Sequence, residues 1–246
     1  MFERVDRIRD VSKCPLRGCF DDCESGDNCD QFKCNAFFNF TLYLAHSGIP
    51  AGKVKYHDIS SNLNKCSDKA KTYINNIIAD PVTFVDNGMS LYLFGNTGVG
   101  KTTIGIKILL NYLYHKCLSY IPDNECRGML VPVDELIEYH RLHKNDPDFA
   151  DNINVILDCD LVVFDNIFAT DYSKYGHEIV DNVLRHRVHN NKSNIYTSNL
   201  TISDAYKECQ MLASLCRERS LPVEIKGKDN RDCNFDDFER LFGGER

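Results

Sequence analysis

The amino-acid sequence predicts an α/β fold in which helices cover both faces of a parallel β-sheet, with a small cysteine-rich domain before it. From about residue 71 onward, short apolar runs alternate with amphipathic stretches, and this alternation is typical of repeated βαβ units. The apolar runs are mostly continuous, as expected for strands that are buried on both faces. The N-terminal domain is indicated by five cysteines crowded into residues 14–34.

The expected elements follow one another in βαβ order. Each predicted strand is a short apolar run, and each predicted helix repeats its apolar residues with helical spacing. The strands are expected at Ser90–Phe94, Gly128–Val133, Leu161–Phe164, Asn194–Thr197 and Val223–Ile225. The helices are expected at Lys71–Ala79, Thr102–Lys116, Asp134–His143, Tyr175–His189 and Ser203–Leu215, with a short one at Ala36–Leu44. Residues 53–70 are polar and predict a linker, so the expected domains are 1–60, a linker at 61–75, and the α/β core at 76–246.

The overall composition narrows the class of protein. The chain has 246 residues, 43% of them apolar, and a net charge of −7. Any contact with nucleic acid therefore requires a local basic patch or several subunits around one groove. No apolar run approaches the ~18 residues of a membrane span, and the N-terminus lacks the apolar region of a signal peptide. We expect a cytoplasmic protein without a membrane partner, whose cysteines are thiols or metal ligands rather than disulfides.

The most informative motif is the octapeptide at residues 95–102, Gly-Asn-Thr-Gly-Val-Gly-Lys-Thr. It fits the phosphate-loop pattern G-x-x-x-x-G-K-[ST] between a predicted strand and a predicted helix. Lys101 is expected to reach the β- and γ-phosphates, and the Thr102 hydroxyl to ligate Mg²⁺. The residues expected to contact the nucleotide are Gly95, Asn96, Thr97, Gly98, Val99, Gly100, Lys101, Thr102 and Thr103. The motif predicts that the chain binds ATP with Mg²⁺.

Two further strand ends complete a predicted catalytic site around Lys101. Asp165 ends an apolar strand and is expected to hold Mg²⁺, usually through water. Asn166 follows it, where many such ATPases carry an acidic residue as the base. Because an amide orients water but cannot take its proton, we expect slow hydrolysis. Glu178 is an alternative base. Asn199 is expected to sense the γ-phosphate, the alternative being that it caps the next helix.

Together these motifs resemble the bacterial replicative-helicase loaders of the DnaC/DnaI type and the related IstB transposition ATPases, a branch of the AAA+ superfamily. The resemblance covers residues 71–246 and is carried by Leu91–Thr102, Leu161–Asp165, Ser173–Tyr175, Ile195–Asn199 and Lys226–Arg231. It implies an AAA+ ATPase core that self-associates, and a factor that binds a hexameric replicative DNA helicase and helps to place it on single-stranded DNA.

The resemblance also implies roles for arginines. Arg231 matches the last arginine of the closing motif, which contacts the nucleotide in this family. The family's trans-acting arginine finger aligns with Ser214 or Leu215, so this chain departs from the pattern there. Arg217 and Arg219 lie close by, and Arg217 is the candidate for the finger. A solvated helix end is the alternative interpretation of both.

Other functions remain open from the sequence. An IstB-like transposition helper would use the same core, and an ATP-binding adaptor that inhibits a helicase is compatible with Asn166. A nucleotide kinase would share the phosphate loop, but the chain shows no arginine-rich lid after the sheet. The helix expected at residues 175–189 could face single-stranded DNA or be an ordinary solvated surface. The residues concerned are Lys174, Tyr175, Arg185, His186, Arg187 and His189.

The N-terminal cysteines are spaced C-x4-C-x3-C-x5-C-x4-C. Four thiolates suffice for a closed Zn²⁺ site, and a loop-rich segment of this size needs such a cross-link to fold. An iron–sulfur cluster would use the same ligands, and free thiols are the third alternative. The candidate zinc ligands are Cys14, Cys19, Cys23, Cys29 and Cys34. By the family resemblance this module would dock the helicase, with an apolar face made of Phe37, Phe38, Phe40 and Tyr43.

Overall fold

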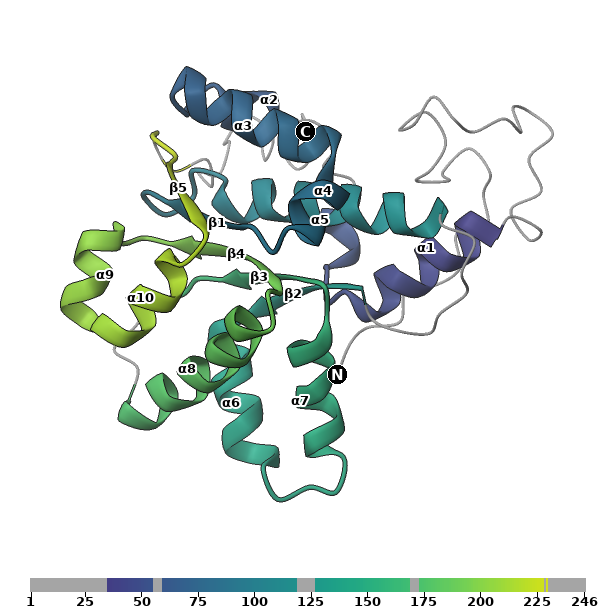
Figure 1. The fold of residues 1–246 in the computed structure, drawn as a ribbon, viewed down its shortest axis with the longest axis vertical. Coiled ribbons are helices and arrows are strands. Elements are labelled where there is room, and N and C mark those ends of the chain that lie inside the picture. Colours follow the sequence, from purple (N-terminus) through teal and green to yellow (C-terminus); the bar gives the residue numbers. More distant parts are fainter. Residues whose placement is uncertain (1–34, 55–58, 119–126, 169–172, 228, 230–246) are drawn as a thin grey trace, which may run out of the picture.

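The computed structural model shows a five-stranded, entirely parallel β-sheet between two layers of helices (Figure 1). It describes residues 35–54, 59–118, 127–168, 173–227 and 229. The strands are β1 (Ser90–Phe94), β2 (Gly128–Pro132), β3 (Leu161–Asp165), β4 (Ser193–Ser198) and β5 (Ser220–Glu224). Four lie within one residue of the predicted runs, whereas β5 begins three residues before the expected Val223–Ile225 and ends at Glu224. The expected α/β class with a parallel sheet is confirmed.

The strand order is β2-β3-β4-β1-β5, so β4 lies between β3 and β1. On one side of β4, Phe94 of β1 pairs with Ser198. On the other side of β4, Phe164 of β3 pairs with Tyr196. Because all strands are parallel, their carboxyl ends meet at one edge of the sheet, where ligands of such folds bind. This order brings the ends of β1, β4 and β3 side by side.

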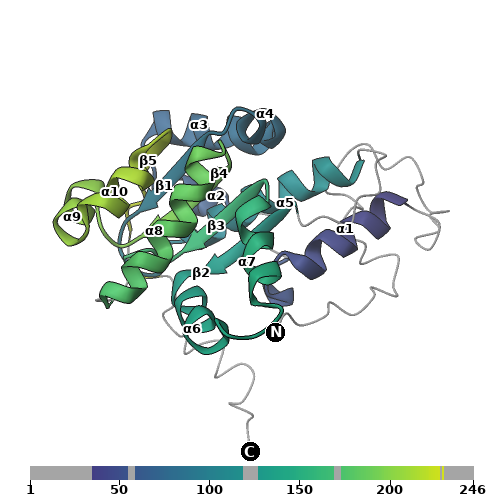
Figure 2. The same cartoon turned by 60° about the horizontal axis from the view of Figure 1, so that its bottom comes forward.

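Each face of the sheet has its own apolar core. Alternate side chains along β1 point to opposite faces: Leu91 and Leu93 to one, Tyr92 to the other. The first core lies under α1, α3, α4 and α5, and the second under α6, α7, α8, α9 and α10, which Figure 2 shows on opposite sides of the strands. Burial on both faces accounts for the continuous apolar runs of the strands.

Within the described residues, the chain forms ten α-helices and one short 3-10 turn. They are α1 (Asn35–His46), η4 (Ala51–Lys53), α2 (Ser60–Leu63), α3 (Asp68–Ala79), α4 (Pro81–Asp86), α5 (Lys101–Leu118), α6 (Val133–His143), α7 (Phe149–Asp158), α8 (Lys174–His189), α9 (Ile202–Glu208) and α10 (Gln210–Arg217). All six expected helices are present, but the one expected at Ser203–Leu215 is broken at Cys209, whose φ of −151° and ψ of 100° are not helical. The short helices α2 and α4 and the longer α7 were not predicted.

The linker expected from the polar composition of residues 53–70 is not a free connection where the structure describes it. Ile59 and Leu63 are buried in the same core as α5, and α3 begins at Asp68 with a Ser67 cap. The described part therefore belongs to the folded core. A separate domain over residues 1–60 stays a prediction, since residues 1–34 lie outside the described part.

Helix α1 packs along α5, on the first face of the sheet (Figure 1). Phe40 lies edge-on against Tyr114 of α5, with ring centroids 6.5 Å apart, and Tyr43 is buried beside it. Of the four aromatic residues expected to dock a partner, these two are therefore turned into the core. Nothing is described of the Phe37 and Phe38 side chains.

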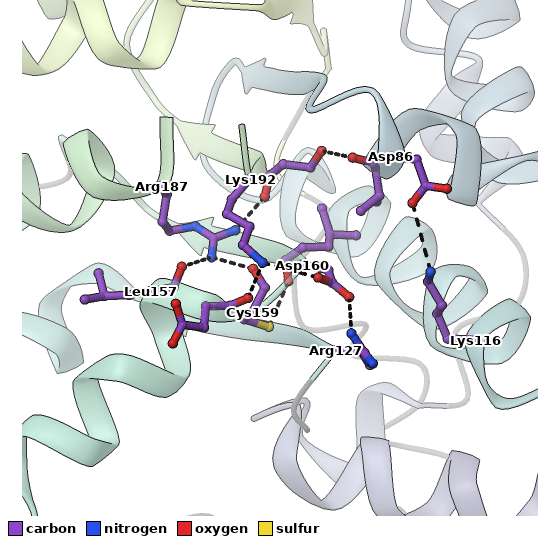
Figure 3. A network of polar contacts seen from close by, with 12 residues as sticks. Asp86, Lys116, Arg127, Leu157, Cys159, Asp160, Arg187 and Lys192 are labelled. Carbon is purple, nitrogen blue, oxygen red and sulfur yellow. Dashed lines mark hydrogen bonds and ion pairs between the residues drawn. The ribbon is translucent and has the colours of Figure 1, made fainter. Parts of the chain in front are cut away.

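Arg187 is not on a solvated or DNA-facing surface, as its position in a basic helix suggested. Its side chain is fully buried and donates hydrogen bonds at 2.7 Å to the carbonyl oxygens of Ile156, Cys159 and Ser193 and to Asn194 Oδ1. Figure 3 shows its guanidinium beside Leu157 and Cys159. Burial lowers the pKa of the guanidinium to about 10, which leaves it charged at neutral pH. Arg187 thus joins the end of α7 to the starts of β3 and β4.

The described residues also bear on the expected metal site and on the possibility of a membrane span. All five candidate zinc ligands lie outside the described residues, and within the described ranges no group of three or more His, Cys, Asp or Glu side chains could hold a metal. Among the described cysteines, Cys66, Cys117, Cys159, Cys209 and Cys216 are thiols outside any disulfide, and all are fully or partly buried. None of the described helices has the length and apolar character needed to span a bilayer.

Candidate nucleotide-binding site

The octapeptide forms a loop between the end of β1 and the start of α5. Gly95, Gly98 and Gly100 have φ values of 147°, 74° and 101°, in the region that favours glycine. At Gly95 a Cβ would overlap the carbonyl oxygen of Ile225, so the close approach of the segment after β5 also requires glycine there. The loop leads directly into α5 at Lys101, and the first backbone N–H groups of a helix point toward an anion at its N-terminus.

Lys101 lies at the centre of the site with its side chain only 7% exposed. Its ammonium donates hydrogen bonds to Gly95 O at 2.9 Å, to Asn96 O at 2.7 Å and to Asn199 Oδ1 at 2.9 Å. A buried ammonium surrounded by neutral oxygens keeps its charge available for a phosphate group. Asn199, which follows β4, is thereby joined to the phosphate loop.

Asp165 is fixed by two hydroxyl groups. Thr102 and Thr197 each donate a hydrogen bond of 2.6 Å to Asp165 Oδ1. A carboxylate oxygen beside a hydroxyl is a suitable ligand pair for Mg²⁺, so the residues present fit this cation. Thr102 and Asp165 are the residues that would hold it, and bound Mg²⁺ would offset the negative charge of the phosphates.

Asn166 has a left-handed backbone, with φ of 65°. Its N–H donates a hydrogen bond of 2.8 Å to Thr197 Oγ1, and the next N–H, that of Ile167, bonds Thr197 O at 2.8 Å. Thr197 therefore accepts from Asn166 and donates to Asp165 with the same hydroxyl group. The Thr197 hydroxyl thus holds the chain where it leaves β3, at the carboxyl end of the sheet.

The structure separates the other candidates. Arg217 ends α10 with an exposed side chain, at the sheet edge where β5 begins. Arg219 has φ of 53°, and its guanidinium lies near Gly88, close to the start of β1 and away from the phosphate loop. Glu178 is exposed on α8, and Arg231 lies outside the described residues.

Tyr175, proposed as a stacking platform for single-stranded DNA, already has protein partners. Its hydroxyl is 2.8 Å from His140 Nδ1, and the Lys144 ammonium lies 5.6 Å from its ring centroid. Burial, with the positive charge of Lys144 as a smaller cause, lowers the pKa of His140. The imidazole is therefore neutral at neutral pH, and its Nδ1 can form a hydrogen bond with the phenol hydroxyl.

Two residues of the site were missed from the sequence. Thr197, on the neighbouring strand β4, donates a hydrogen bond to Asp165. Because the strand that ends before Asn199 was expected beside the site, the position of Thr197 two residues earlier could have indicated this role. Asn62 donates a hydrogen bond of 3.2 Å from its Nδ2 to Val99 O in the phosphate loop. No local pattern indicates this contact, because it joins residues that are 37 positions apart.

Comparisons with known proteins agree with this geometry. The replicative helicase loader DnaI of Bacillus subtilis (strain 168) is 23% identical over an alignment of 158 positions, which covers 58% of this chain and 48% of DnaI. The matched part thus spans about half the length of that relative. Crystal structures of the DnaC helicase loader and of DnaI have TM-scores of 0.55 and 0.56 at 19% identity. They cover 70% and 73% of this chain, and the matches span 99% and 96% of those chains.

The same fold extends to replication initiators. The AMPPCP-bound DnaA structure from Aquifex aeolicus has a TM-score of 0.52 at 15% identity, covering 77% of this chain and 57% of that one. These structural matches show an α/β fold like that of the AAA+ proteins, and the expected resemblance to proteins of the DnaC/DnaI type is confirmed. The model of the family described as "IstB-like ATP binding protein" matches residues 53–213, which contain every described residue of the site except Arg217. The chain belongs to this IstB-like ATP-binding family.

Proposed function

We propose that this protein is an ATP-switched loader, which binds a hexameric replicative DNA helicase and helps to place it on single-stranded DNA. The observation that carries the proposal is the sequence match to DnaI, a replicative helicase loader, over a core whose phosphate loop is joined to the neighbouring strand. Residues 1–60 are the proposed docking module for the helicase. The loader would act in the cytoplasm.

The proposed switch is an exchange of partners by Lys101. In the structure its ammonium holds two loop carbonyls and the Asn199 side chain. Phosphate oxygens are stronger acceptors than neutral carbonyls, because the hydrogen bond then joins opposite charges. When Lys101 turns to the phosphates, Asn199 is released to contact the γ-phosphate. The position of β4 would therefore depend on whether the third phosphate is present.

Slow hydrolysis is part of the proposal, because Asn166 cannot accept a proton. Changing Asn166→Asp is expected to raise kcat for ATP hydrolysis about tenfold or more, since a carboxylate can act as general base. Aspartate tolerates the left-handed backbone of this position. Steady-state phosphate release measures the effect. A wild-type rate typical of vigorous ATPases, left unchanged by Asn166→Ala, would contradict slow hydrolysis as a consequence of this residue.

Self-association through the ATPase domain would place Arg217 at a neighbour's nucleotide. If self-association activates ATP hydrolysis, the rate per molecule rises with protein concentration. In the Arg217→Ala protein this additional activity is expected to fall at least about tenfold, because an arginine finger stabilises charge on the transferring phosphate. The Arg219→Ala protein is the matched control, since Arg219 lies near Gly88. Equal activity of the two variants across a concentration series would refute the assignment of the finger to Arg217.

The loader proposal is tested by reconstitution. Candidate replicative helicase, ATP and single-stranded DNA are mixed with wild-type or Lys101→Met protein, and complexes are separated by size. The wild-type protein is expected to form a complex with the helicase that depends on ATP. The Lys101→Met protein is expected not to form this ATP-dependent complex. Recovery of a transposase instead of a helicase from lysate would favour the IstB-like transposition helper. A stable complex that blocks DNA entry would favour the inhibitory adaptor.

A further inference from the structure

We propose that Asn62 is a positioning residue of the nucleotide site: its side chain orients the Val99–Gly100 peptide so that the Gly100 N–H faces the phosphates. The inference concerns ATP binding alone. It holds whether or not the protein loads a helicase.

The contact is specific and protected from water. Asn62 comes from α2, and its side-chain N–H donates to Val99 O at 3.2 Å. The Asn62 residue is 7% exposed, and Val99 is fully buried. A buried carbonyl without a hydrogen-bond partner is unfavourable, so the peptide is held with its oxygen toward Asn62.

The geometry of the peptide unit passes this constraint to the next N–H group. The described chain contains no cis peptide bond, and in a trans peptide the C=O and the following N–H point in opposite directions. When Val99 O points toward Asn62, Gly100 N–H therefore points to the other side of the loop. That N–H is one of the group with which a phosphate loop surrounds its anion.

Close packing reinforces the orientation. Gly100 has φ of 101°, and a Cβ at this position would overlap Asn62 Nδ2. The amide group of Asn62 thus lies directly against the Gly100 backbone. Glycine is required here by the backbone conformation and by Asn62 together.

The segment around Asn62 is itself well anchored. Ile59 and Leu63 are buried in the core shared with Val99 and Ile225. Lys65 O accepts a hydrogen bond of 3.1 Å from the N–H of Lys226, in the segment that leads toward Arg231. Residues 59–66 therefore connect the phosphate loop with the closing motif, which gives Asn62 a fixed position from which to act.

The first test replaces Asn62→Leu, which keeps the branched shape and removes the donor. The Kd for Mg-ADP, measured by calorimetry, is expected to rise about threefold to tenfold, the effect of one hydrogen bond. The Gly100 amide resonance of the nucleotide-free protein is expected to shift as well. Asn64→Leu is the matched control, because Asn64 is exposed in the same segment and pairs with Lys71. An unchanged Kd with an unchanged Gly100 resonance would overturn the inference.

A second variant keeps the inference testable if the leucine protein does not fold. Asn62→Asp has the same size, but its carboxylate repels Val99 O and cannot donate until it is protonated. Its ADP affinity relative to wild type is expected to recover as the pH falls through the pKa of the new carboxyl. A constant ratio across pH would contradict the positioning role. A wild type that binds ADP and no helicase would sink the loader proposal and leave this inference intact.

Discussion

The Lys101→Met protein is expected to bind ATP at least about a hundredfold more weakly than the wild type. The Lys101 ammonium joins two carbonyl oxygens of the phosphate loop to Asn199. Methionine has a similar length and fills the same buried space, but it offers no charge and no donor. Charge-assisted hydrogen bonds contribute about 1.5–3 kcal/mol each, and about 2.8 kcal/mol corresponds to a hundredfold change in Kd.

Calorimetric titration with Mg-ATP measures this loss. Lys116→Met is the matched control, because Lys116 lies near the far end of the same helix and forms an ion pair of 4.0 Å with Asp86. The control is expected to bind ATP as the wild type does. Equal affinities of the Lys101 variant and the control would show that the octapeptide does not bind the triphosphate through this lysine.

The Arg187→Met protein is expected to lose about 4 kcal/mol of unfolding free energy. The change leaves the carbonyl oxygens of Ile156, Cys159 and Ser193 buried without a donor, and each such acceptor costs about 1–3 kcal/mol. The apolar methionine recovers part of this through packing. The loss is large because α7, β3 and β4 meet at this one side chain (Figure 3).

Urea unfolding followed by circular dichroism measures the difference. Arg141→Met on α6 is the matched control: Arg141 is exposed and pairs with the exposed Glu138 at 2.6 Å. Surface pairs of this kind are worth about 0.2–1 kcal/mol. If both variants unfold at the same urea concentration, the buried network does not stabilise the fold in the way proposed.

Much of the fold could be predicted because its signal is local. Strands β1, β2 and β3 are mostly apolar runs, and burial on both faces of a parallel sheet produces such runs directly. The edge strand β5 mixes Ser, Pro and Glu with apolar residues, so its bounds were predicted less well. Helix α4 also carried a usable signal that was missed: Asp80 caps it and Pro81 occupies its first turn. Helix α7 also carried a signal that was missed: Phe149, Ile153, Ile156 and Leu157 recur with the i, i+4, i+7, i+8 spacing of an amphipathic helix. The break at Cys209 has neither glycine nor proline to mark it.

The site residues also divide into those with a local sequence signal and those without one. The phosphate loop, Asp165 and Asn199 stand in or beside recognisable strand ends, so their positions at one edge follow from the strand order. Asn62 and Arg187 act through contacts between distant segments, and no periodicity distinguishes them from exposed polar residues. Arg187 was even placed in a group of basic side chains with a surface role. Only the packing of α8 against β4 shows that this side chain turns inward.

Helix α5 has a mechanical consequence for the N-terminal part of the chain. It begins at Lys101, and Tyr114, which contacts Phe40 of α1, stands 13 residues further along the same unbroken helix. At 1.5 Å per residue, these two points are about 20 Å apart. A rigid rod of this length that tilts by about 5° at its phosphate-binding end moves its far end by ~2 Å. Shifts of that size at helix interfaces are enough to change how proteins assemble. Any tilt of α5 at the phosphate loop would thus act directly on α1, which packs along the same helix.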